Sequence, residues 1–118
     1  MTMVGKDYNT LLKKIAAALE DRDSVAFADC FSKNGKYFDY CPMLNGGEDW
    51  VAYGSAGIEM FFRNRFAFDM LSVSDPVIES EKAMTFFGAY NGPYIYALFE
   101  IKEIGDDGLI QKAVVYPA

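Results

Sequence analysis

The chain has 118 residues, of which 52% are hydrophobic and 16% are aromatic, and its formal net charge is -6. This length suits one hydrophobic core, so we expect residues 1–118 to form a single domain. The acidic balance and the scattered Lys and Arg residues argue against a nucleic-acid partner, because phosphate backbones are bound by clustered basic side chains.

The N-terminal part of the chain carries helical patterns and then a short strand. In residues 7–20, apolar side chains recur every three or four positions, which is the period of an amphipathic helix. Asp23 is a suitable N-cap for a second helix, which we expect to include Phe31 and to end at the Asn-Gly pair of residues 34–35. Residues 37–40 then predict a strand.

The next segment is irregular, and strands dominate the rest of the chain. Residues 42–53 contain two consecutive glycines and predict a loop over the core. A third helix is predicted to begin with Ser55 as its N-cap and to place Ile58, Phe61 and Phe62 on one face. Turn residues then separate four predicted strands, at residues 66–73, 77–90, 94–104 and 109–116.

The order of these elements indicates the fold class. Helices that come first and antiparallel strands that follow are typical of an α+β fold. We expect a cone-shaped, curved antiparallel sheet with three helices from the N-terminal half packed on its concave face. Such a sheet can enclose a hollow, and the high aromatic content would line that hollow or a subunit interface.

The chain contains no histidine, which excludes Ser-His-Asp and Cys-His catalytic arrangements and histidine-containing metal sites. The two cysteines, Cys30 and Cys41, cannot by themselves complete a structural zinc site, so we expect no metal. Acid–base chemistry would have to use Asp, Glu, Tyr or Lys side chains.

The location of the protein is predicted from two kinds of signal. Residues 1–8 lack the charged and apolar regions of a secretory signal, so we expect a cytoplasmic protein whose thiols stay reduced. No segment approaches the roughly 18 apolar residues of a membrane span. We therefore expect no membrane partner.

Short motifs occur in an order and spacing that are hard to obtain by chance. They are Leu-Glu-Asp-Arg-Asp at residues 19–23, Phe31, Gly-Ser-Ala-Gly-Ile-Glu-Met-Phe-Phe at residues 54–62, and Gly-Leu-Ile at residues 108–110. Through them, nearly the whole chain resembles the nuclear transport factor 2-like superfamily, which includes ketosteroid isomerase and SnoaL-type polyketide cyclases. The resemblance implies a homodimer formed through the sheet, and we expect no cofactor.

The ketosteroid isomerase pattern, carried over from Phe31, places its general-base aspartate on Asp39. Counted back from the glycine before the final strand, the second acid of the isomerase, which donates to an oxyanion, falls on Glu100. The resemblance therefore implies Asp39 and Glu100 as catalytic residues. The oxyanion tyrosines of the isomerase fall on Ile15 and Phe62, which cannot donate a hydrogen bond and are candidates for lining a ligand pocket.

Other tyrosines are candidates to donate instead. Tyr94 and Tyr96 share a strand face with Glu100, because strand side chains alternate, and Tyr116 lies near the end of the last predicted strand. A second arrangement stays open, in which the apolar face of residues 94–104 is the core and Glu100 is solvated on the other face.

The orientation of Asp39 is also open. It shares a strand face with Tyr37, a candidate ligand contact. Turned inward, Asp39 would be desolvated, and the raised pKa would make it a useful base; turned outward, it would be an ordinary surface acid. Met43 and Trp50 either line the mouth of the hollow or form a hydrophobic lid on the core.

Three functions are compatible with these residues. The first is binding of a small apolar molecule in an aromatic-lined pocket. The second is a cofactor-independent isomerase, cyclase or dehydratase-like lyase that uses Asp39 as a base on an apolar carbonyl substrate. The third is a dimeric protein-interaction module with no active pocket. We favour binding, because removing one oxyanion donor typically slows such an enzyme about 100- to 1,000-fold.

Overall fold

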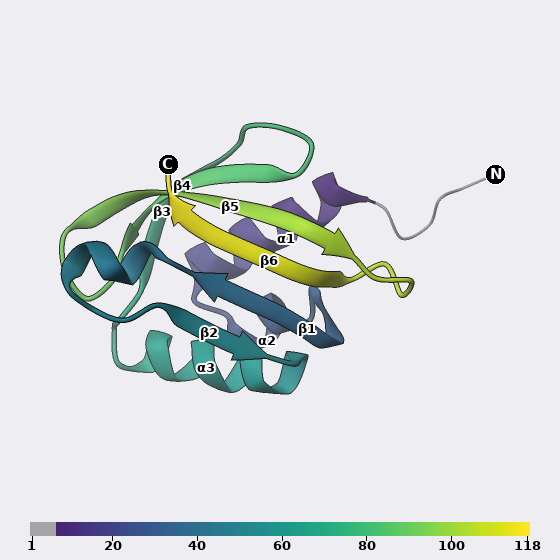
Figure 1. Ribbon diagram of the computed structural model, residues 1–118, viewed down its shortest axis with the longest axis horizontal. Coiled ribbons are helices and arrows are strands. Elements are labelled where there is room, and N and C mark those ends of the chain that lie inside the picture. The colour runs from purple at the N-terminus through teal and green to yellow at the C-terminus, as the bar shows by residue number, and fades with distance from the viewer. Residues whose placement is uncertain (1–6) are drawn as a thin grey trace.

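The computed structural model describes residues 7–118, in which a single sheet carries helices on one face (Figure 1). The signal-sequence prediction concerns residues 1–8, and residues 1–6 lie outside the described range. In chain order the elements are α1 (Tyr8–Asp21), α2 (Ser24–Ala28), β1 (Phe31–Asp39), the 3₁₀ helix η1 (Cys41–Asn45), β2 (Trp50–Tyr53), α3 (Ser55–Ala67), β3 (Ser72–Ile78), β4 (Ala83–Ala89), β5 (Tyr94–Ile104) and β6 (Ile110–Pro117).

The sheet is open, with the strand order β2-β1-β6-β5-β4-β3. The predicted α+β class is confirmed, but the sheet is mixed rather than wholly antiparallel, because β1 pairs with β6 in parallel. The other four pairings are antiparallel. Parallel pairing needs a long crossover, and α3 with the strands β2 to β5 supplies it between β1 and β6.

The helix α1 forms where the periodic pattern predicted it. The Asp7 carboxylate accepts a hydrogen bond from the Thr10 N–H at 3.0 Å and caps the first turn, and Arg22 ends the helix in the left-handed conformation with φ of 54°. Its core-facing side chains recur at helical spacing and are buried: Leu11, Leu12, Ile15, Ala18 and Leu19.

The second helix is much shorter than predicted. Asp23 caps it as expected, accepting from the Ala26 N–H at 3.0 Å, but α2 ends at Ala28 and Phe31 already belongs to β1. The Asn-Gly pair was wrongly predicted to end a helix. A Cβ atom on Gly35 would lie 2.8 Å from the Ile110 carbonyl oxygen, so glycine at this position permits the close approach of β1 to β6.

Several further boundaries differ from the prediction, and the predicted break between strands at residues 74–76 lies inside β3. The expected loop at residues 42–53 contains η1 and β2, with Trp50 as the first residue of that strand. The helix α3 continues to Ala67 and buries Phe66 on its inner face, so β3 begins at Ser72 instead of residue 66. The cap of α3 is Gly54 and not Ser55. In contrast, β5 has the predicted bounds.

The two faces of the sheet differ sharply. Paired residues share a face, so the register Asp39 with Val115, Val115 with Phe99 and Phe99 with Met84 places these four side chains on the inner face, beneath the helices. All four are buried, and with the helix side chains they form one core. The open alternative in which the apolar face of β5 is the core is the one the structure adopts.

Within the described residues, 7–118, no helix has both the length and the apolar character that a membrane crossing requires.

Candidate functional site

Asp39 is the last residue of β1 and has 0% of its surface exposed, which makes it the only charged side chain among residues 7–118 that is completely buried. Strand alternation turns it inward together with Tyr37, which is 2% exposed. Of the two orientations that the sequence leaves open, the structure has the inward one. A buried carboxylate is costly unless it is hydrogen-bonded, so its partners decide how it can be tolerated.

Three donors surround the Asp39 carboxylate. The hydroxyls of Tyr37 and Tyr90 each donate to Oδ2 at 2.7 Å, and the backbone N–H of Cys41 donates to Oδ1 at 2.9 Å. Tyr37 comes from the same strand, whereas Tyr90 follows the end of β4. The sequence prediction missed Tyr90, since no local pattern signals a partner 51 residues away.

Burial and hydrogen bonding act on Asp39 in opposite directions. Desolvation raises the pKa of Asp39 to about 6, while the hydrogen bonds from Tyr37, Cys41 and Tyr90 oppose the increase. Desolvation and the neighbouring carboxylate raise the pKa of both tyrosine hydroxyls well above their usual value. At neutral pH the tyrosines therefore stay protonated and donate hydrogen bonds to a largely ionised Asp39.

Aromatic rings enclose this carboxylate on two sides. On one side of the carboxylate, the Tyr37 ring lies 5.0 Å from Phe62 and 5.8 Å from Phe27. On the other side of the carboxylate, the Tyr90 ring lies 5.0 Å from Trp50. Asp39 thus joins two aromatic groups through the hydroxyls of its tyrosine partners.

A pocket of about 320 Å³ opens next to Trp50 and Tyr90, and we call it the mouth pocket. Its wall includes Trp50 and Tyr90, but Asp39 lies behind Tyr90 and does not line it. The acid is therefore packed within the core while the hollow lies beyond it. The residues that line the mouth pocket are Pro42, Asn45, Gly47, Glu48, Asp49, Trp50, Arg65, Met70, Tyr90 and Asn91.

Glu100 is not brought to Asp39. Glu100 pairs with Val114, one position away from the Val115 that pairs with Asp39, so the two acids lie on opposite faces of the sheet. On the outer face, Glu100 accepts from the Tyr116 hydroxyl at 2.8 Å and forms an ion pair with Lys102 at 3.0 Å. Lys102 and the Tyr116 hydrogen bond lower the pKa of Glu100, which makes it a poor proton donor.

The other predicted site residues divide between the core and the surface. Ile15 and Phe62 are both 0% exposed and pack in the core. Tyr94 and Tyr96, which alternate with the buried residues of β5, lie on the outer face with Glu100, and Met43 is 59% exposed on η1. The residues that meet around Asp39 and the mouth pocket are therefore Tyr37, Trp50 and the unpredicted Tyr90.

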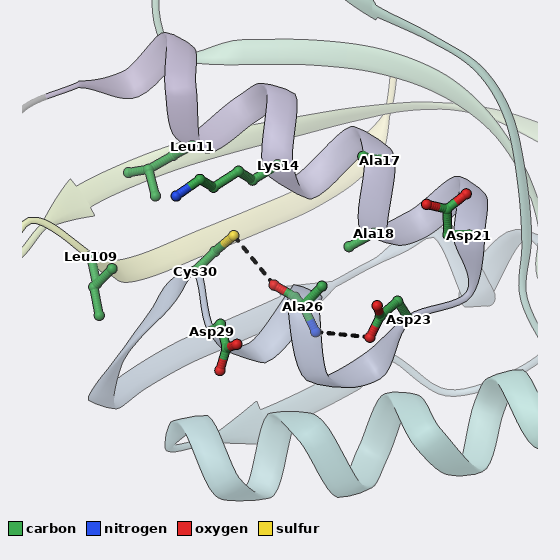
Figure 2. Close-up of a pocket in the computed structure, with 10 residues that line it drawn as sticks. All are labelled: Leu11, Lys14, Ala17, Ala18, Asp21, Asp23, Ala26, Asp29, Cys30 and Leu109. Atoms are coloured by element: carbon green, nitrogen blue, oxygen red, sulfur yellow. Dashed lines mark hydrogen bonds between the residues drawn. The ribbon is translucent and has the colours of Figure 1, made fainter.

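A second hollow of about 360 Å³ lies between α1 and α2, beside the β5–β6 hairpin (Figure 2). Asp23, on its wall, is engaged in capping α2, and the Cys30 thiol donates to the Ala26 carbonyl oxygen at 3.6 Å (Figure 2). None of the residues around Asp39 lines this hollow. We therefore assign the candidate site to Asp39 and the mouth pocket.

The cysteines do not add a nucleophile to the site. Cys30 and Cys41 are buried and form no disulfide. Burial raises the pKa of Cys30 to about 11 and that of Cys41 to about 12, so both stay protonated at neutral pH. Among the described residues 7–118, no group of three or more Cys, Asp or Glu side chains is placed to hold a metal ion.

Comparisons with known proteins identify the fold. No protein-family model matches the chain, and no curated protein matches it. Among solved structures, a protein of unknown function with a cystatin-like fold from Methylobium petroleophilum aligns with a TM-score of 0.70 and 15% identity, covering 100% of this chain and 80% of that one. A nuclear transport factor 2-like protein of unknown function from Mesorhizobium loti aligns with a TM-score of 0.68 and 9% identity, covering 100% and 96%.

A third similar structure comes from Catenulispora acidiphila. It is a hypothetical protein with a ketosteroid isomerase-like fold in complex with trimethylamine, and it aligns with a TM-score of 0.64 and 15% identity, covering 93% of this chain and 86% of that one. The identities are low, so the likeness concerns the fold. This chain, with three helices on an open six-stranded sheet, therefore has the nuclear transport factor 2-like fold that ketosteroid isomerase-like and cystatin-like proteins share.

Proposed function

We propose that this protein binds a small molecule with an apolar ring in the mouth pocket. Asp39, hydrogen-bonded to Tyr37, Tyr90 and Cys41, would support the pocket wall from behind. The observation that carries the proposal is the double role of Tyr90. Its ring forms the wall of the pocket beside Trp50, while its hydroxyl is held at 2.7 Å by the buried Asp39. The wall is thereby pre-organised for a ligand instead of ordered by it.

The size and lining of the mouth pocket support this proposal. Its volume of about 320 Å³ lies at the lower end of the range of small-molecule sites, about 300 to 1,000 Å³. Such sites combine apolar or aromatic walls with polar groups that fix the orientation of the ligand. Here the rings are those of Trp50 and Tyr90, and the polar groups are the amides of Asn45 and Asn91 and the charged side chains of Glu48, Asp49 and Arg65. The Catenulispora acidiphila protein of the same fold, solved with trimethylamine, provides one example of a small organic ligand.

The test uses Trp50, the only tryptophan of the chain, as its own fluorescent reporter. Titration with benzyl alcohol is expected to change the Trp50 emission saturably. Tyr90→Phe keeps the ring but loses the hydrogen bond to Asp39, and it is expected to weaken binding less than Tyr90→Ala, which removes the wall and is expected to weaken binding about tenfold or more. Tyr53→Ala, on the exposed outer face, is the control and should have no effect. Binding that is unchanged in Tyr90→Ala would contradict the assignment of this pocket.

A second candidate function is supported by the pKa of Asp39. A value of about 6 suits a general base near neutral pH, because a catalytic base works best when its pKa is close to the working pH. Tyr37 and Tyr90 supply hydroxyls at positions other than the family tyrosines, and the Tyr90 ring would have to turn aside to admit an apolar carbonyl substrate. Any turnover found by substrate screening should then fall about 100-fold or more in Asp39→Asn while binding is kept.

We also propose a homodimer that forms through the outer face of the sheet. Large apolar side chains are exposed there on three strands, and the rings of Phe87 and Tyr96 pack together at 5.0 Å: Val51, Tyr53, Phe87, Tyr94 and Tyr96. Large apolar side chains exposed on the face of a sheet are typical of an interaction site. A dimer that binds no small molecule would favour the protein-interaction alternative.

The dimer is tested by sedimentation at micromolar concentration. Tyr96→Glu places a charge within the proposed interface and is expected to convert a dimer to a monomer. Met60→Glu, which changes a side chain of similar exposure on α3, is the matched control and should leave the dimer intact. A wild-type protein that sediments as a monomer would refute the proposal.

A further inference from the structure

Arg65 occupies an unusual position in the mouth pocket. It lies in the last turn of α3, and its guanidinium carbon is 3.8 Å from the centre of the Phe61 ring and 5.3 Å from that of Trp50. These ring contacts hold the guanidinium in a fixed place along the pocket wall. The side chain therefore presents a positive charge next to the ring surface that the proposed ligand would contact.

Arg65 is also the arginine without an acidic partner. Of the three arginines in the chain, Arg22 pairs with Asp69 at 2.8 Å and Arg63 pairs with Glu59 at 2.9 Å, whereas Arg65 forms no ion pair with any of residues 7–118. One of its terminal nitrogens donates to the Asn64 side-chain oxygen at 2.9 Å, and its buried Nε has no hydrogen-bond acceptor. Burial disfavours the charged form and lowers the pKa of Arg65.

We infer that Arg65 is the anchor for a carboxylate, so that the ligand class of the mouth pocket is a small aromatic monocarboxylate. This inference rests on the proposed binding function and specifies the chemistry of the ligand. A guanidinium presents its donors as a planar fork that matches the two oxygens of a carboxylate, and such charged hydrogen bonds are stronger than neutral ones. The aromatic part of the ligand would lie against the rings of Trp50 and Tyr90.

Two acidic residues at the rim of the mouth pocket limit the charge that the ligand can carry. Glu48 and Asp49 also line the mouth pocket, but both side chains are exposed, so water and salt screen their charges more than that of the partly buried Arg65. They leave one carboxylate favourable at Arg65 and make a second negative charge unfavourable. A monoanion is therefore the expected ligand, and a dianion or a cation is not.

The experiment compares three planar probes of nearly identical shape: benzoate, benzamide and benzamidinium, which carry negative, zero and positive charge. Binding is followed by Trp50 fluorescence and by the NMR signals of the arginine Nε–H groups. Benzoate is expected to bind about 10- to 100-fold more tightly than benzamide, and benzamidinium more weakly than both. Benzoate is also expected to move the Arg65 Nε–H signal more than those of Arg22 and Arg63.

Variants separate the role of Arg65 from that of the pocket. Arg65→Met should remove the preference for benzoate over benzamide, and Arg65→Lys should keep only part of it, because lysine lacks the planar fork. Arg63→Met makes the same charge change on the opposite, exposed side of α3 and should keep the preference.

The possible failures are distinguishable. If benzamide binds as tightly as benzoate, or benzamidinium binds best, the carboxylate inference is overturned while binding in the mouth pocket stands. If none of the three probes binds at millimolar concentration, the proposed function itself is refuted, and the carboxylate inference with it. The comparison of probes on the wild-type protein remains decisive even if Arg65→Met does not fold.

Discussion

Replacing Asp39 with asparagine is expected to remove a pH dependence of stability worth about 2–3 kcal/mol between about pH 4 and about pH 7. Asp39 titrates at about 6 in the folded chain because it is desolvated, against 3.8 for an ordinary aspartate. Between these values the folded state binds the proton more tightly than the unfolded state. The wild-type protein should therefore lose stability relative to Asp39→Asn as the pH rises through this window, and the difference should level off above pH 6.

Urea denaturation of both proteins at several pH values measures this effect, since asparagine has no charge to titrate. Glu100→Gln is the control, because Lys102 and Tyr116 lower the pKa of Glu100 and its contribution should run in the opposite direction. Glu100 is partly exposed on the outer face, so that effect should also be smaller. A difference between wild type and Asp39→Asn that stays constant with pH would show that the pKa of Asp39 is not raised in the folded state.

Replacing Phe62 with alanine is expected to lower the free energy of unfolding by about 3–5 kcal/mol. Phe62 has 0% exposure on the inner side of α3, and its ring lies 4.1 Å from Phe27 and 5.0 Å from Tyr37. Its removal would leave a cavity beneath the tyrosine that holds Asp39, and the surrounding helices and strands could close that cavity only in part. The midpoint of urea denaturation measures the loss.

Met60→Ala provides the matched comparison on the same helix. Met60 is 62% exposed, and its truncation should change the free energy of unfolding by less than about 0.5 kcal/mol. A loss of less than about 1 kcal/mol in Phe62→Ala would mean that the aromatic interior is not packed as described. A larger effect of Met60→Ala than of Phe62→Ala would mean that the face of α3 that carries Phe62 is not the one that packs against the sheet.

Patterns within single elements predicted much of the fold. The helical period placed the core face of α1, and strand alternation put Tyr37 on the same side as Asp39. The same alternation separated the apolar residues of β5 from Glu100. These features follow from backbone geometry, which repeats every 3.6 residues in a helix and every two in a strand.

Local patterns failed where distant segments compete for the same residues. The stretch after Asp23 has helical spacing as far as Phe31, but the helix ends at Ala28 and Phe31 pairs with Ile110 in the sheet instead. Trp50, expected in a loop, joins a strand because it pairs with Asp39 in the adjacent strand. In both cases tertiary hydrogen bonding overrides a weak local preference.

The candidate site shows the same division. Sequence patterns predicted the α+β order, excluded histidine chemistry and placed Asp39 on a strand with Tyr37. The packing of distant segments buries Asp39, brings Tyr90 to it, places Glu100 on the opposite face and sets Arg65 against Trp50. The periodicity of the sequence predicts which side chains of one element share a face. Burial and pairing depend instead on which segments, often distant in the chain, pack against that face.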